Sequence, residues 1–349
     1  MRIVPAVSVL ALLVLTGCSS VPDSASGAAP TTAVTVSPER VRSLREDIDA
    51  LVRAGATGAI ATLTENGQTL TVTSGVADRS TGAPMPAATP QQVRIGSVSK
   101  VFAASVLLQL VSEGRIRLDD SVDTYLPGLL TGDGVDGKAV TVRQILQHRS
   151  GLPELTDFPE IDEYRAGVQH RTFTPAEEIA IALRHPSQFS PGARFRYTNT
   201  NYIVVGMLIE KVTGRAYSDV LRDRILTPNH LADTYLPGAG EADLRGPHPE
   251  GYAMIDNVLT DVTRQESSVA WAAGAMVSSG DDLDHFGLAL LAGKVVPDAQ
   301  LREMLDLQHT DDFPVQYGLG IGGAELSCGT QFFGHRRDRR IRDDHRCDP

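Results

Sequence analysis

The stretch "RIGSVSKVFAASVLLQLVSEG", residues 94–114, decides how the rest of this chain is arranged. From residue 98 to residue 113 it is apolar on nearly every side, which predicts a helix buried all round rather than one lying on a surface. Gly114 stands where this helix would end, because glycine readily adopts the left-handed conformation that closes many helices. We therefore expect a central helix with the other elements packed around it.

Upstream of this helix, the sequence predicts a second helix and a hairpin. Ser37, Pro38 and Glu39 are typical of a helix start, and apolar residues at helical spacing continue to about residue 55. Asn66 and Gly67 then separate two strand-like segments, which is a strong hairpin signal. A helix packed on an antiparallel hairpin is a common beginning for a mixed domain.

Downstream, residues 115–228 alternate helical patterns with loops that carry Pro and Gly. A further helix is expected near Asp281, and "YGLGIGGAELSCGTQFFGH", residues 317–335, has the glycine-punctuated alternation of paired strands. Sheet elements at both ends predict an α/β (α+β) fold, in which an antiparallel sheet is flanked by helices and carries a mainly helical insertion at about residues 115–228.

Composition excludes several classes of protein. The chain of 349 residues is 42% hydrophobic and 21% charged, which predicts a globular protein with a sizeable core. Its formal net charge of -11 argues against nucleic acid as a partner, because phosphate binding needs a clustered basic surface. The histidines form no HExxH motif, and Cys18, Cys328 and Cys347 are too far apart for a zinc knuckle. We therefore expect no metal and no other cofactor.

The N-terminus has the anatomy of an export signal. Residues 1–17 carry an early Arg2, an apolar stretch and small residues at the end. Together with Cys18 they resemble a bacterial lipobox, in which the cysteine is lipidated; an ordinary signal peptide beside a chance cysteine is the alternative. Residues 18–37 are rich in Ser, Ala, Pro and Thr, as expected of a flexible tether. We expect a protein outside the cytoplasm, anchored by lipid to the bacterial cell membrane.

Ser97 and Lys100 are the first candidates for chemistry. They lie three residues apart at the start of the central helix, so their side chains lie on one face. A serine becomes a nucleophile when a nearby base takes its proton, and a lysine can be that base if burial lowers its pKa. A capping serine beside a solvated lysine is the structural alternative.

Tyr197 and Asn199 form the second candidate pair, in "RYTNTN" just before an apolar helix. Residues two apart in an extended or loop segment point the same way, so a phenol and an amide can face one cavity. The phenol could relay a proton and the amide could hold a substrate carbonyl. A buried hydroxyl beside an N-cap is the alternative.

The order of these two motifs, "SVSK" and then "YTN" about a hundred residues later, resembles the penicillin-recognising serine enzymes. Flanking segments resemble the same family in the same order, among them "VTVRQILQHRSGLP" and "SVAWAAGAMVSSGDDLDHF". The likeness covers about residues 48–335 and is greatest to secreted D-alanyl-D-alanine carboxypeptidases. It implies a β-lactamase/transpeptidase-like fold.

The resemblance also implies residue roles. Ser97 would be the acylated nucleophile, Lys100 its base partner and Tyr197 the proton relay to the leaving group. Asn199 would bind the substrate amide and Trp271 would line the substrate cleft, although a core tryptophan is an equal alternative. The implied substrate is a peptidoglycan stem peptide or a β-lactam, and we expect a monomer. A β-lactamase, an esterase and an inactive, truncated surface lipoprotein are the alternative functions.

The family's third motif, His-x-Gly or Lys-Thr-Gly, falls at His335, a further candidate for substrate binding, but Arg336 and Arg337 follow in place of a glycine. Back-translation of "HRRDRRIRDDHRCDP" and removal of one base gives "HGGTAGYGTTTGVTP", which restores the glycines. We therefore interpret residues 336–349 as an out-of-frame tail. The hydrolase domain would then span residues 38–335 and lack its last strands, so we expect the chain as written to fold poorly and hydrolyse little.

Overall fold

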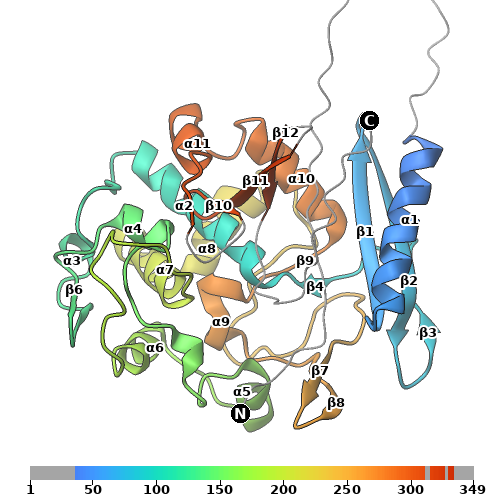
Figure 1. The fold of residues 1–349 in the computed structure, drawn as a ribbon, viewed down its shortest axis with the longest axis horizontal. Coiled ribbons are helices and arrows are strands. Elements are labelled where there is room, and N and C mark those ends of the chain that lie inside the picture. The colour runs from blue at the N-terminus through green and yellow to red at the C-terminus, as the bar shows by residue number, and fades with distance from the viewer. Residues whose placement is uncertain (1–35, 311–314, 327–328, 334–349) are drawn as a thin grey trace, which may run out of the picture.

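A computed structural model describes residues 36–310, 315–326 and 329–333 (Figure 1). The predictions for the signal peptide, Cys18, His335 and the tail lie outside these residues, as do Cys328 and Cys347. Within the described ranges, no helix is both long enough and apolar enough to cross a membrane.

The N-terminal layer is a helix on a small antiparallel sheet, seen in blue in Figure 1. Its elements are α1 (Pro38–Arg53), β1 (Gly58–Glu65), β2 (Gln68–Asp78) and β3 (Ala83–Pro84), with sheet order β1-β2-β3. The side chain of Ser37 caps α1 by accepting a hydrogen bond from the backbone N–H of Arg40 at 3.2 Å. Asn66 and Gly67 have φ values of 52° and 76°, the left-handed pair that a two-residue hairpin turn requires. The predicted helix and hairpin are confirmed.

The central helix is α2 (Ser99–Ser112), and a 3-10 turn, η1 (Gly96–Val98), precedes it. Eleven of its 14 residues are buried, as its apolar sequence predicted. Gly114 has a φ of 70°, the left-handed conformation expected at the end of the helix.

Residues 115–228 are mainly helical, as predicted. The elements are α3 (Val122–Tyr125), α4 (Val142–Leu146), η2 (Leu155–Asp157), α5 (Glu163–Gln169), α6 (Pro175–Ala182), α7 (Thr200–Thr213), α8 (Tyr217–Leu221) and η3 (Arg222–Leu226). A short hairpin of β5 (Thr131–Gly132) and β6 (Val135–Asp136) was not predicted, because two-residue strands carry no alternation in sequence. Helix α7 packs against α2, so the buried faces of both helices form one core.

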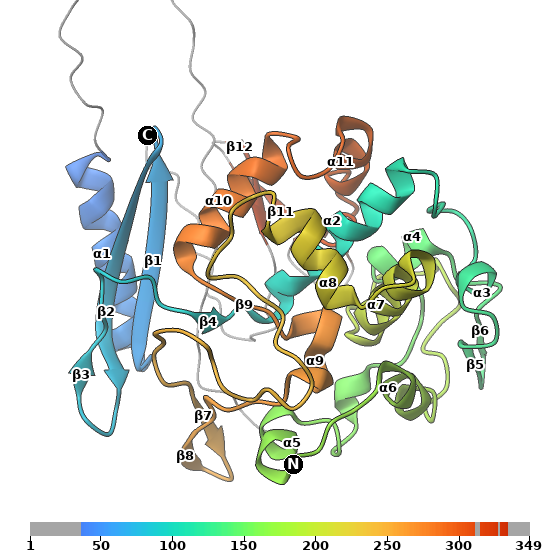
Figure 2. The ribbon, with the colours of Figure 1, turned by 180° about the vertical axis from the view of Figure 1, so that it is seen from behind.

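The chain then returns to the central helix. The remaining elements are β4 (Val93–Arg94), β7 (Tyr252–Ile255), β8 (Val258–Asp261), α9 (Ser267–Gly274), β9 (Val277–Ser278), α10 (Gly280–Leu291), α11 (Asp298–Met304), β10 (Gln316–Tyr317), β11 (Gly322–Leu326) and β12 (Gly329–Phe333). Helix α10 begins beside the predicted Asp281, and Phe286 on it stacks on Phe102 of α2 with ring centroids 3.8 Å apart. Helix α9 was not predicted, because its small residues favour no period. Figure 2 shows α9 and α8 from the opposite side of the molecule.

The mixed α/β fold is confirmed, but its sheet is divided. Among the described residues, β1-β2-β3 and β10-β11-β12 are separate antiparallel sheets with no ladder between them. Helix α10 packs on β1 and ties the first layer to the body of the molecule. At this contact Thr64 Oγ1 donates to Asp284 Oδ2 at 2.9 Å.

Candidate active site

Ser97 and Lys100 meet where the 3-10 turn passes into α2. Ser97 is half-buried, and Lys100 is only 1% exposed. Lys100 Nζ donates to Ser97 Oγ at 3.0 Å, one helical turn away. The two side chains therefore have the proximity that the sequence predicted.

Two more acceptors surround the lysine amine. Lys100 Nζ donates to Asn199 Oδ1 at 2.8 Å and to the backbone carbonyl of Ala273, in α9, at 2.5 Å. A lysine ammonium has three hydrogens, so these two groups and Ser97 Oγ use all of them. Of the three partners only the serine hydroxyl can also donate. When Lys100 loses a proton, its lone pair must therefore face Ser97.

The pKa of Lys100 suits the transfer of a proton between Ser97 Oγ and Lys100 Nζ. Burial lowers it from 10.5 to about 7, and the nearby carboxylates of Glu154 and Glu163 partly oppose the decrease. An amine with such a pKa is present in both protonation states at neutral pH, which is the requirement for a general base.

Tyr197 and Asn199 come from the segment that enters α7. The Tyr197 ring centroid lies 5.0 Å from Lys100 Nζ. Asn199 occupies the N-cap position of α7, but its side chain makes no capping hydrogen bond. It binds Lys100 instead, so the structure brings together four of the sequence-predicted residues.

Two buried residues beside this group, His148 and Glu154, were not predicted from the sequence. The His148 ring lies on Tyr197 with centroids 4.1 Å apart, and burial and the charge of Lys100 lower its pKa well below its ordinary value. Glu154 is 2% exposed and accepts hydrogen bonds from Asn199. A single acid between Leu152 and Leu155 was a signal for Glu154, since apolar neighbours would carry it inside.

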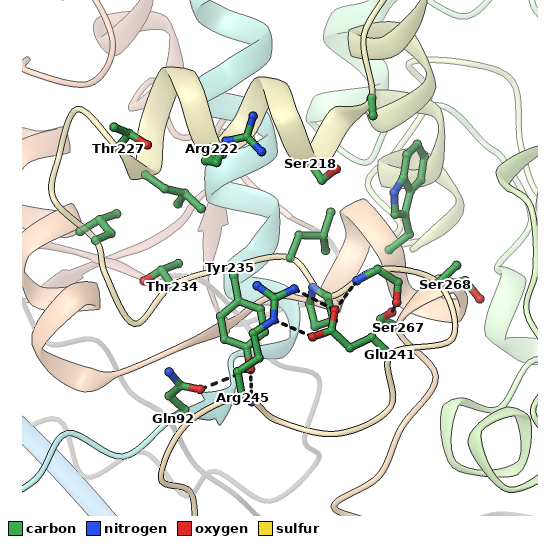
Figure 3. A pocket seen from close by; sticks show the side chains of 18 of the residues that line it. Gln92, Ser218, Arg222, Thr227, Thr234, Tyr235, Glu241, Arg245, Ser267 and Ser268 are labelled. Carbon is green, nitrogen blue, oxygen red and sulfur yellow. Dashed lines mark hydrogen bonds and ion pairs between the residues drawn. The ribbon is translucent and has the colours of Figure 1, made fainter.

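Trp271 lies in a different environment. Its backbone interrupts α9 with φ 32° and ψ -121°, and its indole packs edge-on against Tyr217 at 5.7 Å. It also lines a cavity of about 960 Å³ beside α8 and η3. Figure 3 shows this cavity, in which Arg245 faces Glu241. Contact of Trp271 with substrate stays a prediction.

No group of three or more His, Cys, Asp or Glu side chains within the described ranges could hold a metal ion. His335 and Cys18 fall outside those ranges, so their predicted roles in substrate binding and lipidation stay predictions.

Similarity to known proteins identifies the family to which this site belongs. The sequence matches the Beta-lactamase family over residues 44–336. It is similar to Penicillin-binding protein 4 of Amycolatopsis lactamdurans, with 32% identity over 171 residues, 49% of this chain and 42% of that protein. Protein flp of Staphylococcus aureus (strain COL) is 26% identical over 195 residues, 55% of this chain and 37% of that protein. The chain thus spans less than half the length of these curated relatives.

Solved structures match over more of their length. A D-stereospecific amidohydrolase from Streptomyces sp. has 37% identity and a TM-score of 0.76, covering 84% of this chain and 86% of that chain. The D-amino acid amidase from Ochrobactrum anthropi SV3, in complex with D-phenylalanine, has 30% identity and a TM-score of 0.74, covering 85% and 84%. The family expected from the two motifs is confirmed: this chain belongs to the beta-lactamase family of serine hydrolases, related to penicillin-binding proteins and D-amino acid amidases.

Proposed function

We propose that this chain is a serine hydrolase that forms an acyl-enzyme on Ser97 and acts on cell-wall peptides ending in D-alanyl-D-alanine. The observation that carries the proposal is the contact between Lys100 Nζ and Ser97 Oγ at 3.0 Å, made by a buried amine. That arrangement supplies a nucleophile together with its base.

In the first half-reaction, Ser97 Oγ bonds to the carbonyl carbon of the scissile amide, and its proton passes to Lys100 Nζ. The C–N bond then breaks, and the proton on Lys100 Nζ passes to the departing nitrogen, with Tyr197 as the proposed relay, so Lys100 is neutral again. Asn199 directs one amide hydrogen to Glu154, and we assign its other hydrogen to the substrate carbonyl.

In the second half-reaction, water adds its oxygen to the ester carbon and gives a proton to the same base. Ser97 Oγ leaves with that proton, so the products are an acid and an amine and the enzyme returns to its starting state. The sequence of steps needs no redox partner.

Two similarities support a D-configured substrate. One relative is a penicillin-binding protein, and two of the similar solved structures are a D-stereospecific amidohydrolase and a D-amino acid amidase. Amides of single D-amino acids are therefore the second candidate, favoured by the 86% coverage of the amidohydrolase. β-Lactams and esters remain alternatives, because they enter by the same acylation step.

One set of activity assays separates these candidates, and these and the later kinetic assays use the protein with the reading frame after His335 restored. We expect release of D-alanine from diacetyl-L-lysyl-D-alanyl-D-alanine with a kcat/KM that exceeds those for D-phenylalaninamide and nitrocefin. Faster release of ammonia from D-phenylalaninamide would favour the second candidate. Equal hydrolysis of the L-alanyl-L-alanine peptide, or no covalent acyl group on Ser97, would contradict both.

We also propose that the protein works outside the cytoplasm, held to the bacterial membrane through lipidated Cys18. The support is the signal-like sequence of residues 1–17 and the Ser/Ala/Pro/Thr-rich stretch that follows. Cys18→Ser should move the protein from the membrane fraction to the soluble fraction of the host. Unchanged membrane retention would contradict lipidation at this residue.

A further inference from the structure

Residues 148–155 form a clamp around the segment that carries Tyr197 and Asn199. His148 Nδ1 accepts a hydrogen bond from the backbone N–H of Thr198 at 3.2 Å, and the carbonyl of His148 accepts from Arg196 N at 2.8 Å. The carbonyl of Pro153 accepts from the hydroxyls of Thr198 and Thr200 at 3.2 and 2.7 Å. The clamp therefore contacts both sides of the two candidate residues.

Glu154 makes the closest contacts of this clamp with Asn199. Its Oε2 accepts from the backbone N–H of Asn199 at 2.8 Å, and its Oε1 accepts from Asn199 Nδ2 at 3.1 Å. Thr156 also donates to Oε1, through its backbone N–H at 3.0 Å and its hydroxyl at 2.9 Å. A carboxylate that is only 2% exposed thus has four donors.

These contacts set the direction of the Asn199 amide. Because Nδ2 is directed to Glu154, Oδ1 must face the other way, and it accepts from Lys100 Nζ at 2.8 Å. A flipped amide would place its NH2 group against the lysine, where a donor would oppose a donor. The carboxylate therefore selects the one orientation in which Asn199 can bind the protonated lysine.

Glu154 also contributes charge. The groups around Lys100 are two acids, one imidazole and a cluster of phenols: Glu154, Glu163, His148, Tyr197, Tyr202 and Tyr317. His148 adds no positive charge to offset the acids, since burial and the charge of Lys100 lower its pKa well below its ordinary value. Of the two carboxylates, Glu154 has the larger effect on Lys100.

We propose that Glu154 is a positioning residue, which fixes the amide orientation of Asn199 and supplies the buried negative charge opposite Lys100. The proposal rests on the proposed function for its kinetic consequence, but its electrostatic consequence can be measured without any substrate.

The substrate-free test uses the small number of lysines. The sequence contains four, Lys100, Lys138, Lys211 and Lys294, so protein labelled with [13Cε]lysine gives four NMR signals that single substitutions assign. Lys100 should titrate near pH 7 in the wild type. In Glu154→Gln its midpoint should fall by at least about half a pH unit, because removal of a nearby negative charge disfavours the ammonium form.

Glu160→Gln is the matched control, since Glu160 pairs with Arg184 at the surface. It should leave the Lys100 midpoint unchanged. A Glu154→Gln midpoint equal to that of the wild type, or equal shifts in both variants, would overturn the proposal.

The kinetic test measures acylation of Ser97 by a fluorescent penicillin between pH 5 and pH 9. Glu154→Gln should lower the maximal rate about tenfold through loss of Asn199 orientation. It should also move the acid limb of the profile to lower pH, which simple loss of folded protein would not do. If the penicillin does not acylate the wild type but the Lys100 midpoint still falls in Glu154→Gln, the proposed function is disproved and the electrostatic role of Glu154 stands.

Glu154→Asp separates charge from geometry and also serves if the glutamine variant does not fold. It keeps the negative charge on a shorter side chain, so the Lys100 midpoint should stay close to that of the wild type while acylation slows. A midpoint that falls, or acylation at the wild-type rate, would contradict the proposal.

Discussion

Helix α9 has two contrasting neighbourhoods only two residues apart. The carbonyl of Ala273 binds the buried amine of Lys100, whereas Trp271 lines the cavity of about 960 Å³. Two charged groups of that cavity form an ion pair at the surface: Arg245 Nε lies 2.6 Å from Glu241 Oε1, and the side chains are 53% and 33% exposed. The comparison teaches that the size of a cavity does not identify the reactive site, because a titrating amine requires burial and fixed acceptors.

The largest expected effect is on activity, and it distinguishes the Ser97–Lys100 side of α9 from the cavity side. Ser97→Ala should lower kcat/KM at least about 10³-fold and remove the covalent adduct, because no oxygen nucleophile remains beside Lys100. Ser218→Ala changes a serine that lines the cavity and should leave kcat/KM within about twofold. Steady-state kinetics and intact-protein mass spectrometry measure both variants. Similar losses in the two would contradict the distinction between the Ser97 site and the cavity.

The pH profile tests the buried amine itself. Lys100 must be neutral to accept the serine proton, and its pKa is lowered to about 7. The kcat/KM should therefore rise with pH up to about 7 and then level off, and about tenfold should be lost for each pH unit well below that value. An acid limb near pH 4, measured with a substrate that does not titrate, would point to a carboxylate base instead.

A substitution that disturbs the packing of Trp271 should have an intermediate effect, on the free energy of unfolding. A Cβ added at Gly206 of α7 would lie 2.5 Å from the indole and 2.9 Å from the Cβ of Ala272. Gly206→Ala should therefore lower the free energy of unfolding by about 1–3 kcal/mol, despite the better helix propensity of alanine. Gly238→Ala, where the nearest atom is 3.8 Å away, is the control for urea unfolding and should be nearly neutral. Equal stabilities would show that Trp271 can move aside.

The smallest expected effect concerns the ion pair of the cavity. Glu241→Gln should lower the free energy of unfolding by less than about 1 kcal/mol, because water screens the exposed partners. It should leave kcat/KM unchanged. A loss of activity in this variant, measured beside Glu160→Gln, would show that the two sides of α9 are coupled.

Local patterns were sufficient to predict much of the fold. Ser37 and Asn66 carry their signals in adjacent residues, and the apolar run after Ser97 identified the central helix. Helix α9 could not be predicted in this way, because its small residues fit a turn as well as a helix. Its break at Trp271 lies where α9 packs against α7 and the indole meets Tyr217 of α8, and no local pattern contains these contacts.

The site was predictable only in part, for a similar reason. Ser97 and Lys100 are close in sequence, so helical geometry alone brings them together. Glu154 and Asn199 are 45 residues apart, and the acid is buried where residues 148–155 contact the segment that carries Asn199. His335 and the tail of residues 336–349 lie outside the described part of the chain, and the frame hypothesis stays a prediction that resequencing of the DNA after the His335 codon checks.

The three fixed acceptors of Lys100 have a further consequence for proton accounting. Ser97, Asn199 and Ala273 use every hydrogen of the ammonium, so the base can store a single proton and has no hydrogen left for a water molecule. Acylation then begins with one proton moving from Ser97 Oγ to Lys100 Nζ, and deacylation ends with one proton moving back between the same two atoms. Where one of these two transfers limits the rate, rates in mixtures of light and heavy water should vary linearly with the deuterium fraction, which distinguishes this site from one that moves protons along a chain of waters.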